Sequence, residues 1–133
     1  MHITRQADYA IRIVLCLSQV RDKLEMKAIA EETAVTPQFT FKILRTLVQK
    51  KIVKSLRGVH GGYSLACDPE ELTLLDIIEA IDGPIVLSPC VQDDNICTRM
   101  GREKSKCPVH HFFTDLNTEV HNRLKSRTIE SLA

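Results

Sequence analysis

The stretch 26–66 constrains the fold of this chain more than any other. It reads MKAIAEETAVTPQFTFKILRTLVQKKIVKSLRGVHGGYSLA. Its helical periodicity predicts a short helix over about 26–32, a break at 33–35, and a second helix with Thr36 as N-cap and Pro37 at its first position. Alternation of apolar and polar residues on both sides of RGVHGG then predicts a two-stranded hairpin. Two ordinary packed helices are an alternative for the first half alone, but the hairpin that follows favours a winged helix-turn-helix.

Charge is distributed unevenly along the chain, although the net charge is only +1. Residues 1–67 contain 11 Lys and Arg against 5 Asp and Glu, whereas residues 68–133 contain 7 against 12. No acidic residue occurs between Thr33 and Cys67. This cationic region predicts an anionic partner, and with the winged helix pattern that partner is double-stranded DNA.

The expected DNA contacts come from two places. The start of the second helix would enter the major groove, and the hairpin tip would reach the minor groove or the phosphates. The candidate residues are Thr36, Gln38, Phe39, Thr40, Lys42, Arg45, Arg57, His60, Gly61 and Gly62.

The remainder of the chain predicts three more helices. The first begins near Thr4, the second follows a capping box at Thr73 and stops at Gly83, and the last runs from about Pro108 to Arg127. The long apolar stripe of the last helix predicts packing against a second copy, with packing on the first helix as the alternative. We therefore expect a mainly α fold with a small β-hairpin wing and a long C-terminal dimerisation helix. Its parts would be a DNA-binding domain (1–83), a cysteine-containing loop (84–107), and the dimerisation helix with its tail (108–133).

The loop contains SPCVQDDNICTRMGREKSKCPVHHF, with Cys90, Cys97 and Cys107 among polar residues and no apolar periodicity. No apolar run is long enough to cross a bilayer, and the polar start does not resemble a signal peptide, so we expect a cytoplasmic protein without a membrane partner. Thiols stay reduced in that compartment, which favours metal or redox chemistry over structural disulfides. Cys16 is expected in the core, and Cys67 is expected to have no role.

Several segments together resemble one known family. They are ITRQADYAIRIVLCLS, IAEETAVTPQFTFKILRTLVQKKIVKSLRGVHGGYSLA, LTLLDIIEAIDGP and the three-cysteine loop. They look like the IscR, NsrR and RirA regulators, sometimes called the Rrf-two family. The resemblance implies a homodimeric transcription regulator, not an enzyme, that binds an operator with two half-sites. It also implies that an iron–sulfur cluster, [2Fe–2S] or [4Fe–4S], controls the DNA affinity.

The resemblance also implies a set of cluster ligands. Cys90, Cys97 and Cys107 match the three family cysteines, although their spacings of six and nine residues are longer than in the best-known members. The fourth ligand would be Asp8, as in NsrR-type members, or His110, as in IscR-type members. Asp8 is slightly favoured, because a carboxylate is a poor ligand for a reduced cluster and exchanges readily, which suits sensing.

Other readings of the loop remain open. The flanking Arg99, Arg102, Lys104 and Lys106 favour thiolates and an anionic cluster. A switch between two thiols and a disulfide needs no metal and ranks second. A zinc site of three cysteines and His110 ranks third, because the close cysteine pairs of structural zinc sites are missing. An electron carrier and a zinc-stapled interaction module are alternatives from other classes.

Overall fold

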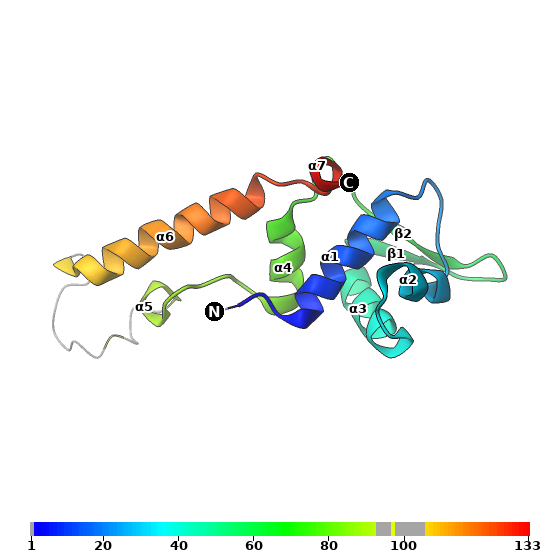
Figure 1. Cartoon of the computed structure of the whole chain (residues 1–133), viewed down its shortest axis with the longest axis horizontal. Helices are drawn as coiled ribbons and strands as arrows, with labels where there is room; N and C mark the ends of the chain where they lie inside the picture. Colours follow the sequence, from blue (N-terminus) through cyan, green and yellow to red (C-terminus); the bar gives the residue numbers. More distant parts are fainter. Residues whose placement is uncertain (1, 93–96, 98–105) are drawn as a thin grey trace.

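The computed structural model describes residues 2–92, 97 and 106–133. The fold is mainly helical with one two-stranded antiparallel hairpin, which confirms the predicted class (Figure 1). The elements follow in the order α1 (Arg5–Ser18), α2 (Met26–Thr33), α3 (Pro37–Gln49), β1 (Val53–Leu56), β2 (Gly62–Leu65), α4 (Leu74–Asp82), α5 (Pro89–Gln92), α6 (Pro108–Lys125) and α7 (Ile129–Leu132).

Three threonines begin helices, as the sequence predicted. The side chain of Thr4 accepts a hydrogen bond from the amide of Ala7 (3.2 Å), and this satisfies one of the free N–H groups at the start of α1. Thr36 caps α3 in the same way. Thr73 and Asp76 form a reciprocal capping box at α4.

The core lies between α1, α2, α3, α4 and the base of the hairpin. It is built of aliphatic side chains, including Ile13, Ile29, Leu44, Leu47 and Ile77, each with none of its surface exposed. Cys16 is buried among these helices, as expected for a small apolar side chain. The core therefore holds the helix-turn-helix and the wing as one unit.

The wing is tied to the rest of the domain by a contact that the sequence did not reveal. Leu24 forms an isolated bridge with Tyr63, with N–O distances of 2.8 and 3.0 Å between their backbones. A Cβ atom on Gly62 would lie 2.7 Å from the carbonyl oxygen of Leu24, and one on Gly61 would lie 2.5 Å from that of Leu56. The two glycines therefore allow close backbone packing inside the protein. Their expected contact with DNA stays a prediction.

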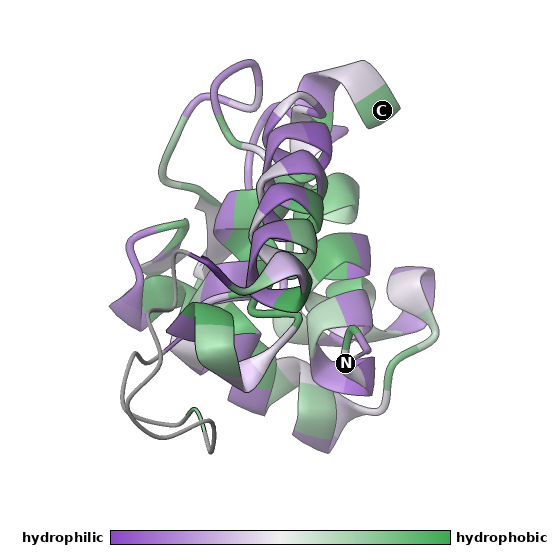
Figure 2. Ribbon diagram, turned by 90° about the vertical axis from the view of Figure 1, so that its left-hand side faces the viewer, coloured by the Kyte–Doolittle hydropathy of each residue, from purple (hydrophilic) through white to green (hydrophobic). Residues whose placement is uncertain are grey.

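Helix α6 extends away from the helical core, and α5 lies near its far end (Figure 1). None of its 18 residues is fully buried. Val109 and Phe112 are exposed, and Phe112 exposes 62% of its surface. Figure 2, in which α6 comes toward the viewer, shows hydrophilic and hydrophobic segments along it. Within this chain, α6 packs beside α4 and α5.

The chain returns to the core after α6. Helix α6 ends at Lys125, two residues earlier than predicted, and α7 was not predicted. Ile129 in α7 is completely buried in the core cluster. The backbone there is paired with the start of α4, since the Leu74 amide donates to the Arg127 carbonyl (2.9 Å) and the Ile129 amide to the Leu72 carbonyl (2.8 Å). The tail thus packs with the winged helix core.

Candidate nucleic-acid interface and cysteine centre

One face of α3 is exposed and polar or basic. Burial of Ile43, Leu44 and Leu47 turns the opposite side of the helix toward solvent. Its exposed residues recur at helical spacing and form what we call the α3 stripe: Gln38, Phe41, Lys42, Arg45 and Gln49. The stripe contains three of the predicted contacts. It lies within the part of the sequence that has no acidic residue.

The structure corrects one predicted contact and adds another candidate. Thr40 has none of its surface exposed, and its hydroxyl lies 3.4 Å from the Val35 carbonyl, so its side chain is not available to DNA. Phe41 exposes 52% of its surface within the α3 stripe. Phe41 was not among the predicted contacts, although the helical spacing of the buried residues places it on the exposed face of α3. Phe39 is partly exposed and packs edge-on against Tyr9 of α1 (6.0 Å between ring centres).

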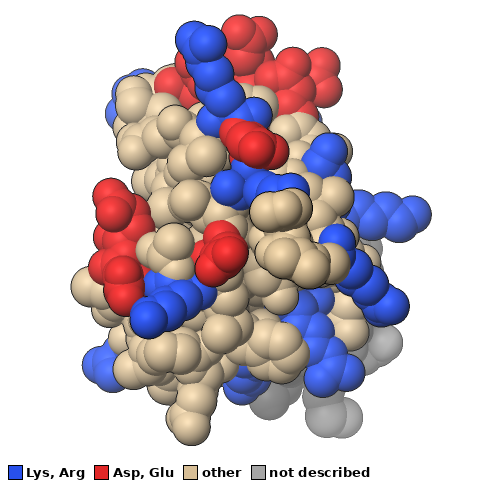
Figure 3. Space-filling view, turned by 90° about the vertical axis from the view of Figure 1, so that its right-hand side faces the viewer, with Lys and Arg blue, Asp and Glu red and all other residues tan. Residues whose placement is uncertain are grey.

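The tip of the wing is open to solvent. Arg57 and His60 are exposed, and Val59 between them exposes 93% of its surface. Figure 3 looks at the wing end of the molecule and shows Lys and Arg gathered along its right side, with Asp and Glu mainly at the top and left. The α3 stripe and the wing tip are the surfaces through which winged helix proteins contact the major groove and the adjacent backbone or minor groove.

The five cysteines are thiols that form no disulfide with one another, and their surroundings separate them into two groups. Burial raises the pKa of Cys16, and Glu32 raises it further. Burial also raises the pKa of Cys67, with smaller contributions from acidic neighbours of which Asp76 is the largest. A thiol with a raised pKa stays protonated and is a poor metal ligand. These two cysteines therefore lack the chemistry of a metal site.

The other three cysteines lie along one polar segment, with Cys97 between Cys90 and Cys107. Cys90 is half-buried in α5, Cys97 is exposed, and Cys107 is half-buried at the N-cap of α6. The hydroxyl of Ser88 lies 3.2 Å from the Cys90 sulfur, close enough to donate a hydrogen bond to a thiolate. Within the described ranges, no three His, Cys, Asp or Glu side chains are close enough together to hold a metal ion. The structure therefore does not gather the three thiols.

The basic residues expected around these thiols are only partly described. Lys106 is exposed immediately before Cys107. Arg99, Arg102 and Lys104 lie outside the described residues.

The two candidates for a fourth ligand have different surroundings. Asp8 is about half exposed and forms an ion pair with Arg12 (2.7 Å), one turn along α1. The guanidinium of Arg12 lies over the Tyr9 ring, which in turn contacts Phe39 at the start of α3. The Asp8 carboxylate is thus already paired with a cation. Helix α1, which carries it, packs against α3.

His110 in α6 is half-buried, and its Nδ1 atom is buried with no hydrogen-bond partner in the described part of the chain. Buried polar atoms are nearly always satisfied, so an orphaned imidazole nitrogen indicates a missing partner such as a metal ion. Three thiols and an imidazole form a soft donor set of the kind that holds iron–sulfur clusters. The donor atoms of these residues therefore fit such a group.

The fold and these surfaces define a class: a winged helix DNA-binding protein with a cysteine-containing segment before a long C-terminal helix. Residues 3–133 match the Rrf2 family, described as "Iron-dependent Transcriptional regulator". A "Putative HTH-type transcriptional regulator rrf2-like" from Rhodobacter capsulatus is 34% identical over 98% of this chain and 91% of its own length. The chain belongs to the Rrf2 family of DNA-binding transcription regulators.

Two solved structures show the same fold. CymR of B. subtilis, titled the global cysteine regulator, matches with a TM-score of 0.80 and 25% identity, covering 100% of this chain and 96% of its own. IscR of T. potens matches with a TM-score of 0.74 and 20% identity, covering 99% of this chain and 85% of its own. Among the described residues, no helix is both long and apolar enough to span a membrane.

Proposed function

We propose that this protein is a homodimeric transcription regulator whose operator affinity is controlled by an iron–sulfur cluster. Cys90, Cys97, Cys107 and His110 would hold the cluster, which supplies a redox-active centre that reacts with oxygen or nitric oxide. The buried, unpartnered Nδ1 of His110, three residues after Cys107, is the observation that carries this choice. Asp8 is the less favoured ligand because Arg12 already neutralises it.

Cluster binding would connect the two ends of the segment between α5 and α6. Cys90 precedes this segment and Cys107 follows it, so capture of both by one centre closes a loop at the far end of α6. Exposed Val109 and Phe112 near that end favour pairing of α6 with a second copy of the chain. Closing or opening the loop then changes how the two DNA-binding domains are held, with a coupling free energy of about 1–3 kcal/mol.

The α3 stripe would read the major groove of each half-site. Gln38, Lys42 and Arg45 offer hydrogen bonds to bases and phosphates, and Phe41 offers apolar contact to a thymine methyl group. At the wing, Arg57 and His60 would contact the minor groove or the backbone. The half-sites of a two-fold dimer would lie about one helical turn apart (roughly 34–36 Å).

A cluster-free thiol regulator is the second candidate. The similarity to the structure titled as a global cysteine regulator favours it, as does the presence of three cysteines outside the core that are not joined in a disulfide. Oxidation of two of these thiols to a disulfide would close the same loop without iron.

The test compares cluster-loaded and cluster-free protein under anaerobic conditions. Wild-type protein incubated with iron and sulfide should become brown and contain both elements, and its affinity for an operator selected from random DNA should differ from that of the empty form. Cys97→Ser should lose the colour and the difference in affinity. Cys67→Ser is the matched control and should keep both, because its thiol has the wrong environment for a ligand.

Each result distinguishes the candidates. Failure of the wild type to take up iron, or equal operator affinity of the loaded and empty forms, would refute cluster control. A change in affinity caused by a reversible disulfide in iron-free protein would establish the thiol regulator instead.

The wing contact has a separate test. Arg57→Ala should weaken operator binding and reduce the slope of log affinity against log salt by about 0.9, the value for one phosphate contact. Arg127→Ala, which removes an exposed arginine near α7, is the control and should leave the slope unchanged. An unaltered slope in Arg57→Ala would contradict the wing contact.

A further inference from the structure

Helix α6 has a line of polar side chains along one face. His110, Thr114, Asn117 and His121 are separated by four, three and four residues, so they lie on one side of the helix. We call them the α6 polar line. All four are half-buried, whereas their neighbours His111 and Phe112 are exposed.

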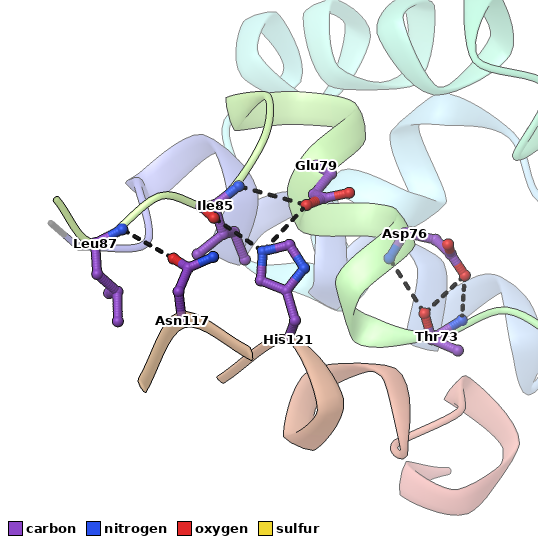
Figure 4. A network of polar contacts seen from close by, with 7 residues as sticks. All are labelled: Thr73, Asp76, Glu79, Ile85, Leu87, Asn117 and His121. Atoms are coloured by element: carbon purple, nitrogen blue, oxygen red, sulfur yellow. Dashed lines mark hydrogen bonds and ion pairs between the residues drawn. The ribbon is translucent and has the colours of Figure 1, made fainter. Parts of the chain in front are cut away.

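The C-terminal half of the line is fastened to the chain that leaves α4. The amide of Leu87 donates to Asn117 Oδ1 (3.0 Å), and His121 Nε2 donates to the Ile85 carbonyl (2.9 Å). Glu79 of α4 lies 3.8 Å from the same ring nitrogen of His121 (Figure 4). These contacts fix the segment that leads into α5.

The N-terminal half of the line has no such partners among the residues that the structure describes. His110 Nδ1 and Thr114 Oγ1 are both buried and make no hydrogen bond within that part of the chain. His121 contacts the backbone of Ile85, and Asn117, one turn earlier in α6, contacts that of Leu87. Thr114 and His110, further toward the start of α6, therefore face the residues that follow Leu87. Those residues include α5, which packs on α6 and carries Cys90.

The free hydroxyl of Thr114 is unusual for a helix. Threonine in a helix commonly donates to the carbonyl four residues before it. Thr118 does so here, to the carbonyl of Thr114 (3.0 Å), and Thr46 does so to that of Lys42 (3.3 Å). Thr114 leaves this bond unmade although its oxygen is buried. Two buried orphan atoms one turn apart, beside the helix that carries a thiol, indicate a partner that binds between α5 and α6.

We propose that Thr114 is a positioning residue of the cluster site, and that its γ-hydroxyl donates a hydrogen bond to a sulfur atom of the loaded centre. This inference rests on the proposed function. Hydrogen bonds to sulfur stabilise the more negative, reduced state of a cluster and raise its reduction potential. They also help retain the metal, since loss of a supporting hydrogen bond typically weakens metal binding about 10–100-fold.

The test exploits the opposite effects that the hydroxyl would have in the empty and loaded proteins. Thr114→Val keeps the shape of the side chain and removes the hydroxyl. In the empty protein it should raise the melting temperature, because a buried atom without a partner is lost. In the loaded protein it should speed release of iron to a chelator about 10-fold or more and lower the reduction potential.

Two further variants serve as controls. Thr114→Ser restores the hydroxyl and should return the release rate and the potential toward the wild-type values. Thr118→Val, an exposed position one turn away, should leave both unchanged.

The outcomes separate this inference from the proposed function. A higher melting temperature with unchanged iron release and potential would overturn the role of Thr114, and so would destabilisation of both the empty and loaded forms. If wild-type protein takes up no iron and sulfide, the proposed function fails and this inference fails with it, whatever the melting temperature of Thr114→Val.

Discussion

The side chains of the five cysteines have different chemistry because of their immediate surroundings. Cys16 is buried and Cys67 is half-buried, and both lie near carboxylates; the burial and the nearby negative charge raise the pKa of each thiol. Cys90, Cys97 and Cys107 lie outside the core in a segment rich in cations. Three reactive thiols therefore lie together in sequence, and the two less reactive thiols lie within the DNA-binding domain.

This division predicts the order of alkylation. Because the thiolate is the reactive species, iodoacetamide at pH 8 should label Cys90, Cys97 and Cys107 of the empty protein faster than Cys16 and Cys67. The difference in labelling rate between the two groups should become smaller as the pH rises through the raised pKa values of Cys16 and Cys67. Peptide mass spectrometry over a time course measures this, and denatured protein, in which the five rates should converge, is the control. Labelling of Cys67 as fast as Cys97 in the native protein would contradict it.

Single residues were predictable where the cause is local. Thr36 and Thr73 were identified as caps because a capping threonine acts within its own turn. The burial of Thr40 was missed because it depends on which side of α3 faces the core. The unpartnered state of His110 Nδ1 could not be predicted at all, since it depends on what α5 and α6 bring near it.

At the scale of elements, the turn between α2 and α3 is formed by an unusual residue. Ala34 adopts the left-handed conformation (φ 55°, ψ 37°) at the C-cap of α2. Its amide and that of Val35 donate to the carbonyls of Glu31 and Ala30, and these bonds complete the end of the helix. A left-handed conformation costs a residue with a Cβ atom roughly 1–2 kcal/mol, and glycine avoids that cost.

Ala34→Gly should therefore stabilise the protein. Glycine's greater entropy in the unfolded state offsets part of the gain, so we expect the free energy of unfolding to rise by up to about 1 kcal/mol. Urea denaturation measures it. Ala30→Gly is the matched control in the same helix and should lower the free energy of unfolding by at least about 1 kcal/mol, because Ala30 is helical and buried. Equal destabilisation by the two changes would show that Ala34 is not strained.

Elements with their own periodicity and caps were predicted, whereas those that depend on distant pairing were not. Helices α1 to α4 and the hairpin have clear patterns. The bridge from Leu24 to Tyr63 and the short helix α7 exist because the chain meets a remote partner, and four residues are too few to show a period. The cysteine ligand set was assigned from resemblance to a family and stays a prediction.

At the scale of the whole molecule, the end of the chain closes the fold. Ile129 is inserted between elements that all precede α6, and backbone hydrogen bonds join its neighbours to the start of α4. The tail thus fastens the C-terminal end of α6 to the DNA-binding domain.

Ile129→Ala should destabilise the whole domain. Removal of a fully buried isoleucine side chain typically costs about 2–5 kcal/mol. Leu132→Ala, in the same short helix at a position that is 44% exposed, should change the free energy of unfolding by less than about 0.5 kcal/mol. Urea denaturation of the empty protein compares the two. A small effect for Ile129→Ala would mean that the tail does not contribute to the core.

Because α6 projects from the core, a small change in its tilt moves its far end through a larger distance. Its 18 residues span about 27 Å, so a tilt of about 10° at the fastened end sweeps the opposite end through on the order of 5 Å. DNA rises about 3.4 Å per base pair, so this displacement is comparable to a register step of one base pair. Under the proposed function, a small rearrangement at the cluster would therefore displace the two DNA-binding domains of a dimer by about the spacing of one base pair.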